Sequence, residues 1–323
     1  MGEKPFRAKQ VYEWLWQKAA WDFDSMTNLS KELRAKLRAQ FVLQPLTIDM
    51  EQRSSDGTVK VRFKTHDGHM VEGVLIPTEN RWTACVSSQV GCSLNCKFCA
   101  TGYLKRQRNL RPDEIFDQVI LLNQLAEKYY ESHLSNIVFM GMGEPLLNYK
   151  NVLAGIDRLT AEDGLNMSPK RITVSTAGIA KMIRKLGEDQ VKFNLALSLH
   201  ATTDQQRNEL MPINEQNNLE VLVDALNDFY RNTKGRITFE YILFDGINES
   251  IDDAKRLVDL CRRVPAKINI IEYNPIAEAT FSKSKHMQRD RFITYLEDHG
   301  VTATVRKSRG KDIDAACGQL ANK

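Results

Sequence analysis

The sequence predicts an α/β protein whose main part is an incomplete (β/α)6 barrel, preceded by a small N-terminal helical domain and an antiparallel β extension. Three observations predict this class. Two amphipathic segments open the chain, turn dipeptides then separate short strands, and beyond Arg111 helical and strand patterns alternate. The composition agrees, because 323 residues with 42% hydrophobic and 27% charged side chains are enough for a core of barrel size.

The N-terminal region, residues 1–46, is expected to be a helical domain. Residues Phe6–Lys18 and Ser30–Phe41 each place their apolar side chains at helical spacing. This is the pattern of a short amphipathic helix that packs one face against a partner. Two such helices predict a small unit in front of the main domain.

An antiparallel β extension is expected at residues 47–77. Two Asp-Gly dipeptides, at residues 56–57 and 67–68, are typical of tight hairpin turns. The predicted strands around the second turn are Val59–Lys64 and Met70–Ile76. Strands joined by such turns pair antiparallel, so this segment should form a small sheet that leads into the barrel.

The barrel is expected at residues 78–310, followed by a C-terminal tail at 311–323. Strands separated by helices pair in parallel through right-handed crossovers, and about six β/α units predict a partial barrel. Loops after the carboxyl ends of its strands should carry the functional residues. The predicted strands are Trp82–Ser87, Asn136–Met142, Arg171–Ser175, Lys192–Leu199, Arg236–Phe244, Lys267–Tyr273 and Val301–Val305. The predicted helices are Asp113–Tyr130, Tyr149–Leu159, Asn218–Arg231, Ile251–Arg262 and Met287–His299.

The composition predicts a cytoplasmic protein with no membrane partner. No stretch approaches about 18 uninterrupted apolar residues, and the first ten residues mix four charged side chains with no apolar signal core. Six cysteines in a reducing compartment indicate metal or redox chemistry rather than a disulfide framework. Cys261, on an amphipathic helix, is expected to be a core residue.

Positive charge is concentrated locally, although the net charge is only +4. Lys105, Arg106, Arg108 and Arg111 lie together, and a second group of lysines and arginines lies between residues 283 and 311. Such clusters suit phosphate contacts, so the first group is our candidate contact with a phosphate-bearing partner. The alternative is a solvated basic surface.

Cys92, Cys96 and Cys99 form the most specific motif, a Cys-x3-Cys-x2-Cys run. Three thiolates this close in sequence converge on one centre only if the segment is a compact loop. A 4Fe-4S cluster is normally held by four cysteines, so three leave one iron open to another molecule. The alternative is a structural zinc site that adds Cys85, although the gap between Cys85 and Cys92 is unlike a paired zinc knuckle.

This run resembles the signature of the radical S-adenosylmethionine (SAM) superfamily, in which the open iron binds SAM and an aromatic residue, here Phe98, precedes the last cysteine. Three further segments are similar to the RlmN branch of the RlmN/Cfr RNA methyltransferases: VSSQVG at 86–91, GMGEPLLN at 141–148 and DIDAACGQL at 312–320. The resemblance covers nearly the whole chain. It implies a radical SAM barrel, a 4Fe-4S cluster on the three cysteines, SAM as cofactor and an RNA-binding N-terminal domain.

The resemblance also implies the reaction. The RlmN branch methylates C2 of adenosine 2503 in 23S rRNA and, in dual-specificity members, C2 of adenosine 37 in some tRNAs. Because adenine C2 and the SAM methyl group are both electrophilic, a thiolate has to carry the methyl group, and Cys317 matches that carrier. Cys85 matches the cysteine that releases the product by a transient disulfide with Cys317, and Glu72 matches the proton acceptor. Without the resemblance, a buried strand cysteine and a solvated strand glutamate would be the commoner interpretations.

Residues at the ends of four predicted strands match the SAM contacts of the family. Gly143 permits close backbone approach, and the Glu144 carboxylate can receive the SAM ammonium. The other matches are Ser175, Ser198, Leu199, His200 and Asn274. Each of these residues alone could cap a helix or form a turn, but four strand ends at the same end of the barrel favour a binding site.

Alternatives to this interpretation stay open. Pro145 favours the RlmN branch over Cfr-type members, which methylate C8 of the same base and resemble Gly-Glu-Ala here. A zinc-bearing RNA-binding module is the alternative from another class. The expected partners are 23S rRNA, tRNA and an electron donor such as flavodoxin or ferredoxin, and the expected state is a monomer. Residues 6–10 resemble a point where relatives already have an upstream helix, so the chain is either a short member or a truncated one.

Overall fold

One large sheet organises the molecule. The computed structural model describes residues 2–322, within which ten strands form a sheet in the order β1-β2-β3-β4-β7-β8-β9-β10-β11-β12. Strands β1 to β4 pair antiparallel, and the strands from β4 onward pair in parallel. This confirms the predicted partial β/α barrel with an antiparallel extension. Met1 and Lys323, which the predicted segments 1–46 and 311–323 include, lie outside the described residues.

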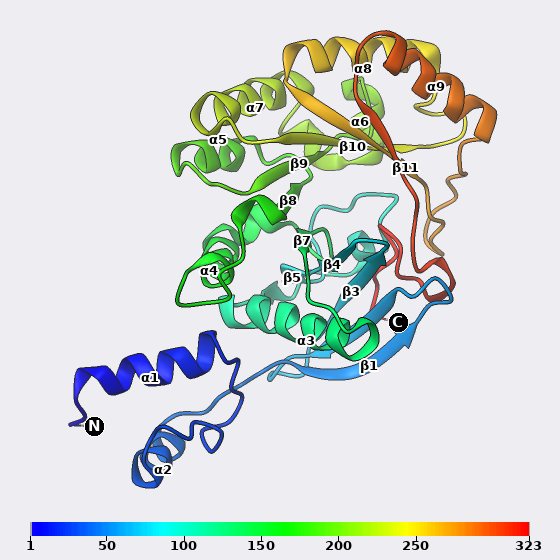
Figure 1. The fold of residues 1–323 in the computed structure, drawn as a ribbon. Coiled ribbons are helices and arrows are strands. Elements are labelled where there is room, and N and C mark those ends of the chain that lie inside the picture. The colour runs from blue at the N-terminus through cyan, green and yellow to red at the C-terminus, as the bar shows by residue number, and fades with distance from the viewer. Residues whose placement is uncertain (1, 323) are drawn as a thin grey trace.

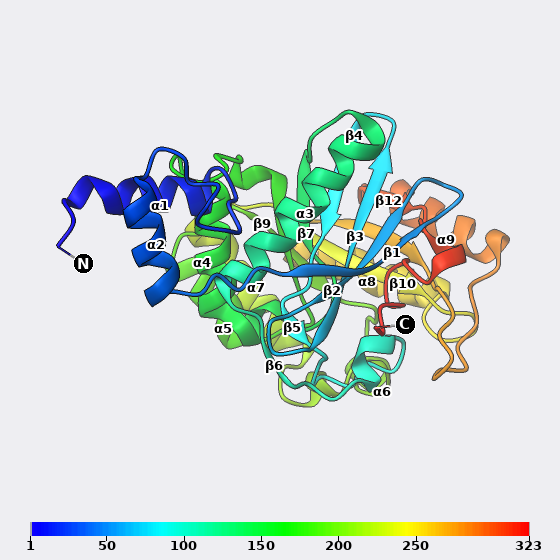
Figure 2. The same ribbon diagram turned by 90° about the horizontal axis from the view of Figure 1, so that it is seen from below.

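The N-terminal helices form a small unit to one side of the sheet (Figure 1, Figure 2). Helix α1 spans Pro5–Trp16 and α2 spans Lys31–Gln40. Ser30 begins α2, because its hydroxyl accepts a hydrogen bond from the backbone N–H of Leu33. The unit has a separate apolar core formed by Phe23, Met26, Leu29, Leu33 and Leu37.

The antiparallel extension consists of β1 (Thr47–Arg53), β2 (Val59–Lys64) and β3 (Met70–Thr78), which leads into β4 (Arg81–Cys85). Both predicted hairpins are confirmed. Gly57 and Gly68 occupy the left-handed region at the two turns, where glycine carries no steric cost. The C-terminal segment, red in Figure 1, lies next to this extension.

Strands and helices alternate along the rest of the chain, with the helices on the outer side of the sheet (Figure 1). The two-residue strands β5 (Gln89–Val90) and β6 (Arg108–Asn109) pair with each other in a separate small sheet. The remaining strands are β7 (Asn136–Phe139), β8 (Ile172–Thr176), β9 (Asn194–Ser198), β10 (Ile237–Leu243), β11 (Ala266–Glu272) and β12 (Ala303–Arg306). The helices are α3 (Pro112–Tyr130), α4 (Tyr149–Thr160), α5 (Ala180–Glu188), α6 (Asp204–Leu210), α7 (Leu219–Thr233), α8 (Ile251–Arg263) and α9 (His286–Asp298).

Helices α5 and α6 were missed by the sequence analysis, which placed the strands now called β8 and β9 in direct succession. The two helices are short, with nine and seven residues. Helix α5 also contains Gly187, a poor helix former. The structure explains this glycine, because a Cβ there would lie 3.1 Å from the Cα of Phe229 on α7. Close packing of α5 against α7 therefore favours glycine at this position, although glycine weakens the helical pattern in the sequence.

Apolar side chains between the sheet and its helices form the main core, and a smaller cluster around Phe98 and Phe244 lies at the carboxyl ends of the strands. Cys261 is half-buried at the edge of the main core. In residues 2–322 no helix has both the length and the apolar character needed to cross a membrane.

Candidate active site

Three cysteines reach one cavity at the carboxyl ends of the parallel strands. The loop that carries them is compact: Cys92 forms a backbone bridge with Lys105, and the Cys99 N–H donates to the Cys96 carbonyl at 3.2 Å. Gly91 is required there, because its φ is 74° and a Cβ would lie 2.5 Å from the Lys105 carbonyl oxygen. Cys92, Cys96 and Cys99 all line the cavity, which we call the three-cysteine cavity.

These thiols fit a 4Fe-4S cluster better than a single metal ion. Burial raises the pKa of all three, to about 11 for Cys92, so without a metal they stay protonated at neutral pH. Between residues 2 and 322, no three His, Cys, Asp or Glu side chains converge closely enough to share one ion. Cys85 lies on β4, outside the wall of this cavity. The four-cysteine zinc site is therefore not formed, whereas thiols spread around a cavity suit the separate irons of a cluster.

The loop after β7 supplies Gly143 and Glu144 to the same cavity. A Cβ on Gly143 would lie 2.5 Å from the Cβ of Gln89, so the close approach requires glycine. The buried Glu144 carboxylate accepts hydrogen bonds from the N–H groups of Ala177 at 2.7 Å and Leu146 at 3.0 Å. Burial raises the pKa of Glu144 to about 7. Glu144 thus ties two loops together and keeps lone pairs for a cation in the cavity.

Ser175, Ser198 and His200 also line this cavity, as predicted from their places at strand ends. The two serine hydroxyls lie 3.5 Å apart. The His200 Nδ1 accepts a hydrogen bond from the Ile242 N–H at 3.1 Å, which leaves the ring proton on Nε2. Burial lowers the pKa of His200 to about 3. His200 is therefore a neutral hydrogen-bond donor of fixed tautomer.

Leu199 and Asn274 do not line the cavity. Leu199 is buried, and its N–H donates to the carbonyl of Glu240 at 3.0 Å. The Asn274 side-chain amide donates to the backbone carbonyl of Cys317 at 3.3 Å. Asn274 therefore contacts the C-terminal tail in this structure, and its predicted contact with SAM stays a prediction.

Cys317 lies where two cavities meet. It lines the three-cysteine cavity and a second one, the Cys85 cavity, whose wall also includes Arg306. Cys85 is buried, and burial raises the pKa of its thiol to about 12. Cys317 is exposed to solvent as a residue, and the protein atoms around its thiol raise the pKa to about 11. The Arg306 guanidinium opposes both shifts. The fold therefore brings the two cysteines, distant in sequence, to one cavity beside a cation.

Glu72 lies beneath the C-terminal tail and lines neither cavity. Its side chain is 0% exposed, so the solvated strand glutamate is the wrong interpretation. The Glu72 Oε2 accepts hydrogen bonds from the N–H groups of Ala321 at 2.9 Å and Asn322 at 3.0 Å. The Glu72 Oε1 faces the Lys60 Nζ at 3.6 Å. Its role as proton acceptor stays a prediction.

Charged residues that the sequence analysis missed also belong to the site. Glu240 of β10 lines the three-cysteine cavity, and its Oε2 lies 3.3 Å from the Arg306 Nη1. Arg207 of α6 is fully buried and donates to three carbonyls at the carboxyl ends of β8 and β9, those of Ala177, Ser198 and Leu199. Arg306 ends β12, so the strand-end rule could have found it. Glu240 lies inside a strand and Arg207 lies in a helix that was not predicted, so their positions in the sequence gave no indication that they belong to the site.

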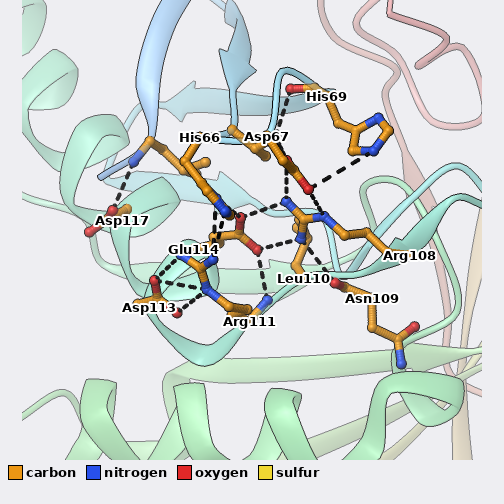
Figure 3. Close-up of polar contacts among 12 residues, drawn as sticks. His66, Asp67, His69, Arg108, Asn109, Leu110, Arg111, Asp113, Glu114 and Asp117 are labelled. Atoms are coloured by element: carbon orange, nitrogen blue, oxygen red, sulfur yellow. Dashed lines mark hydrogen bonds and ion pairs between the residues drawn. The ribbon is translucent and has the colours of Figure 1, made fainter. Parts of the chain in front are cut away.

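The basic stretch after the cysteines is partly used inside the protein. Figure 3 shows Arg108 between two carboxylates, with contacts of 2.8 Å to Glu114 and 2.6 Å to Asp67. Arg111 likewise pairs with Asp113, as Figure 3 also shows. Lys105 and Arg106 are exposed, and in residues 2–322 neither forms an ion pair with a carboxylate. The candidate RNA contact therefore narrows to these two residues.

Known proteins are similar to this chain over its whole length. The family models for the Ribosomal RNA large subunit methyltransferase N-terminal domain and the Radical SAM superfamily match residues 1–43 and 86–260. "Probable dual-specificity RNA methyltransferase RlmN" of Cytophaga hutchinsonii is 60% identical over 322 residues, which cover 100% of this chain and 88% of that protein. "Dual-specificity RNA methyltransferase RlmN 2" of Myxococcus xanthus is 47% identical over 328 residues, covering 100% and 86%. The crystal structure of a radical SAM methyltransferase from Sphaerobacter thermophilus has a TM-score of 0.94 at 41% identity, covering 98% of this chain and 93% of that one.

Proposed function

We propose, from the premise that this chain belongs to the RlmN family of radical SAM RNA methyltransferases, that it methylates C2 of adenosine 2503 in 23S rRNA and C2 of adenosine 37 in some tRNAs. The place of Cys317 is the observation that carries the proposal. One thiol lines both the three-cysteine cavity and the Cys85 cavity. A methyl-carrying thiol needs this position. It has to receive the methyl group and pass it on beside the cofactors, and a second thiol then has to reach it to free the RNA.

The residues present fit both cofactors. Cys92, Cys96 and Cys99 would hold the 4Fe-4S cluster. Gly143 and Glu144 would receive the amino-acid part of SAM, because the glycine permits close approach and the carboxylate pairs with an ammonium. The other proposed SAM contacts are Ser175, Ser198, Leu199, His200 and Asn274. When bound, the cluster and SAM together supply a methyl group and a carbon-centred radical that can remove a hydrogen atom.

Cys317 and Cys85 handle the methyl group in turn. The Cys317 thiolate is the nucleophile that becomes S-methylcysteine, and Arg306 favours the thiolate by its charge. After the carbon of that methyl group has bonded to adenine C2, the protein and the RNA are covalently joined. A one-electron acceptor takes the unpaired electron of this adduct and the C2 proton leaves, which restores the aromatic ring. The Cys85 thiolate then attacks the Cys317 sulfur and the carbon–sulfur bond breaks, so a disulfide between Cys85 and Cys317 forms. The bonding electrons go to the carbon attached to the base, which takes up a proton and becomes the methyl group. Glu72 is proposed to accept the C2 proton.

The RNA is proposed to bind across the N-terminal domain, residues 1–46, and the exposed pair Lys105 and Arg106. Residues 1–46 carry eight Lys and Arg against five Asp and Glu, so most of the net charge of +4 lies there. The base has to leave its stack to reach the cavity. In this scheme residues 47–77 form the extension, 78–310 the barrel and 311–323 the tail. A flavodoxin or ferredoxin supplies the electron, and the protein acts as a cytoplasmic monomer.

A cysteine variant tests the proposal. Cys317→Ala should keep its iron and bind SAM yet transfer no methyl group to a 23S rRNA fragment, whereas Cys261→Ala, which alters a half-buried cysteine of α8, should retain activity. Liquid chromatography of the nucleosides against 2-methyladenosine and 8-methyladenosine standards, with detection by mass spectrometry, distinguishes methylation at C2 from the Cfr-like product at C8, because the two isomers have the same mass. Methyl transfer by Cys317→Ala at the wild-type rate would refute the carrier role.

A further inference from the structure

We propose that the antiparallel extension is a clamp for the carrier tail, residues 310–322, and that Lys60 and Glu72 are positioning residues that hold the end of this tail. The inference deepens the proposed function, on which it rests for its catalytic meaning. The contacts themselves come from the fold. They hold the tail at both ends and leave Cys317 between them.

The first end of the tail is held by the turn between β1 and β2. The N–H of Gly310 donates to the Asp56 carboxylate at 3.0 Å. The Asp312 carboxylate accepts hydrogen bonds from the hydroxyl of Ser54 at 2.5 Å and the N–H of Ser55 at 3.0 Å. These bonds lower the pKa of Asp312, as expected for a carboxylate that is engaged in its charged form.

The second end of the tail is held by a buried ion pair. The Lys60 and Glu72 side chains are 3% and 0% exposed, on neighbouring strands of the extension. A carboxylate buried so deeply needs hydrogen-bond donors, and the two tail amides of Ala321 and Asn322 supply them to a single oxygen, Oε2. Arg62, two residues beyond Lys60 on β2, also donates to the Asn322 carbonyl at 3.3 Å. The last described residues of the tail, which are themselves half-buried, are thus bound to a buried ion pair.

The middle of the tail is bound to the cysteine loop. The carbonyl of Gly318 accepts a hydrogen bond from the N–H of Ala100 at 2.7 Å, and the carbonyl of Leu320 accepts one from the Thr101 hydroxyl at 2.6 Å. Ala100 and Thr101 follow Cys99 directly. The clamp therefore sets the position of Cys317 relative to the three cysteines.

The clamp and the proposed proton transfer use the same carboxylate, that of Glu72. While Oε2 of Glu72 accepts the tail amides, Glu72 is covered and lines neither cavity. The carboxylate becomes available to a substrate only when the end of the tail leaves. We infer that the docked tail is the state in which Cys317 is loaded, and that release of residues 321 and 322 uncovers Glu72 for the C2 proton.

Hydrogen exchange tests the clamp directly. Glu72→Gln alone leaves Lys60 buried without a counter-charge, so the test uses the double variant Lys60→Met/Glu72→Gln, which removes both charges together. Hydrogen bonds to a neutral acceptor are weaker than those to a carboxylate, so amide exchange in the C-terminal peptide should rise about tenfold or more. The control is Lys128→Met/Glu51→Gln, which removes an ion pair between α3 and β1. Exchange is followed by mass spectrometry on the full-length, cluster-loaded protein without oxygen.

Two further measurements keep the proposal falsifiable. Asp312→Asn alters the exposed first end, which does not threaten folding, and should also increase tail exchange. The fraction of Cys317 that carries a methyl group should fall in the double variant, while iron content and SAM affinity stay at the wild-type values. Wild-type exchange in both tail variants would overturn the clamp. If the tail loosens as expected but wild-type protein never methylates RNA, the proposed function fails and the clamp stands.

Discussion

Replacing Arg108 with methionine should destabilise the protein by removing the cation seen at the centre of Figure 3. Glu114 is only 1% exposed, and its two oxygens each lie 2.8 Å from a nitrogen of Arg108. Leaving a buried carboxylate without its cation costs about 3–5 kcal/mol. The lower end of this energy range applies, because the Arg108 side chain is 24% exposed and water can therefore reach the pair. Loss of the more exposed pair with Asp67 adds at most about 1 kcal/mol, so we expect a total loss of about 3–4 kcal/mol.

Urea unfolding followed by circular dichroism measures this loss as a shift in midpoint. Arg106→Met is the matched control, since it removes an exposed arginine two positions earlier. Its stability should change by less than about 0.5 kcal/mol. Its RNA affinity should instead weaken, with a salt dependence reduced by about one phosphate contact. The reasoning is refuted if Arg108→Met keeps wild-type stability and only its RNA affinity changes.

Three further predictions concern Gly143 in the loop after β7, Asp117 on α3 and the thiol of Cys85. Gly143→Ala should abolish SAM binding in equilibrium dialysis while the protein stays folded, because the new Cβ would lie 2.5 Å from the Cβ of Gln89; SAM affinity within about threefold of wild type would contradict this, since strained loops cost on the order of 1–3 kcal/mol. Burial raises the pKa of Asp117, which accepts the Leu46 N–H at 3.0 Å, to about 7. The folded state therefore holds a proton on Asp117 that the unfolded chain releases, so the stability of the wild-type protein falls as the pH rises towards 7. Asp117→Asn should therefore gain stability over wild type between pH 5 and pH 8. If the urea midpoints of Asp117→Asn and wild type change in parallel over this pH range, the prediction is wrong. Cys85→Ser should leave RNA covalently attached to Cys317, visible as a shifted band on a denaturing gel, and release of methylated RNA at the wild-type rate would exclude the releasing role.

Local patterns account for the elements that the sequence predicted correctly. The two Asp-Gly turns need only four neighbouring residues, and their glycines adopt the expected left-handed conformation. The cysteine spacing likewise specifies a compact loop, whose Gly91 meets the backbone of Lys105. The strand-end rule placed Ser175 and Ser198 in the cavity, because parallel strands bring their carboxyl ends to one edge. These inferences succeed because the interacting groups are close in sequence or are aligned by the sheet.

Other features depend on packing between distant segments. Gly187 weakens the pattern of α5, and its reason is the approach of α7. For Glu72 the residue pattern without the family resemblance favoured a solvated strand position, but the C-terminal tail covers this side chain. The sequence by itself determined the fold class, the three-cysteine loop and the family likeness of the tail motif. Only the tertiary structure decided that Cys317 lies between two cavities, that Arg306 stands beside both thiols and that Glu72 holds the tail. Side-chain contacts of this kind arise from the register and packing of the whole sheet, which no local pattern of residues encodes.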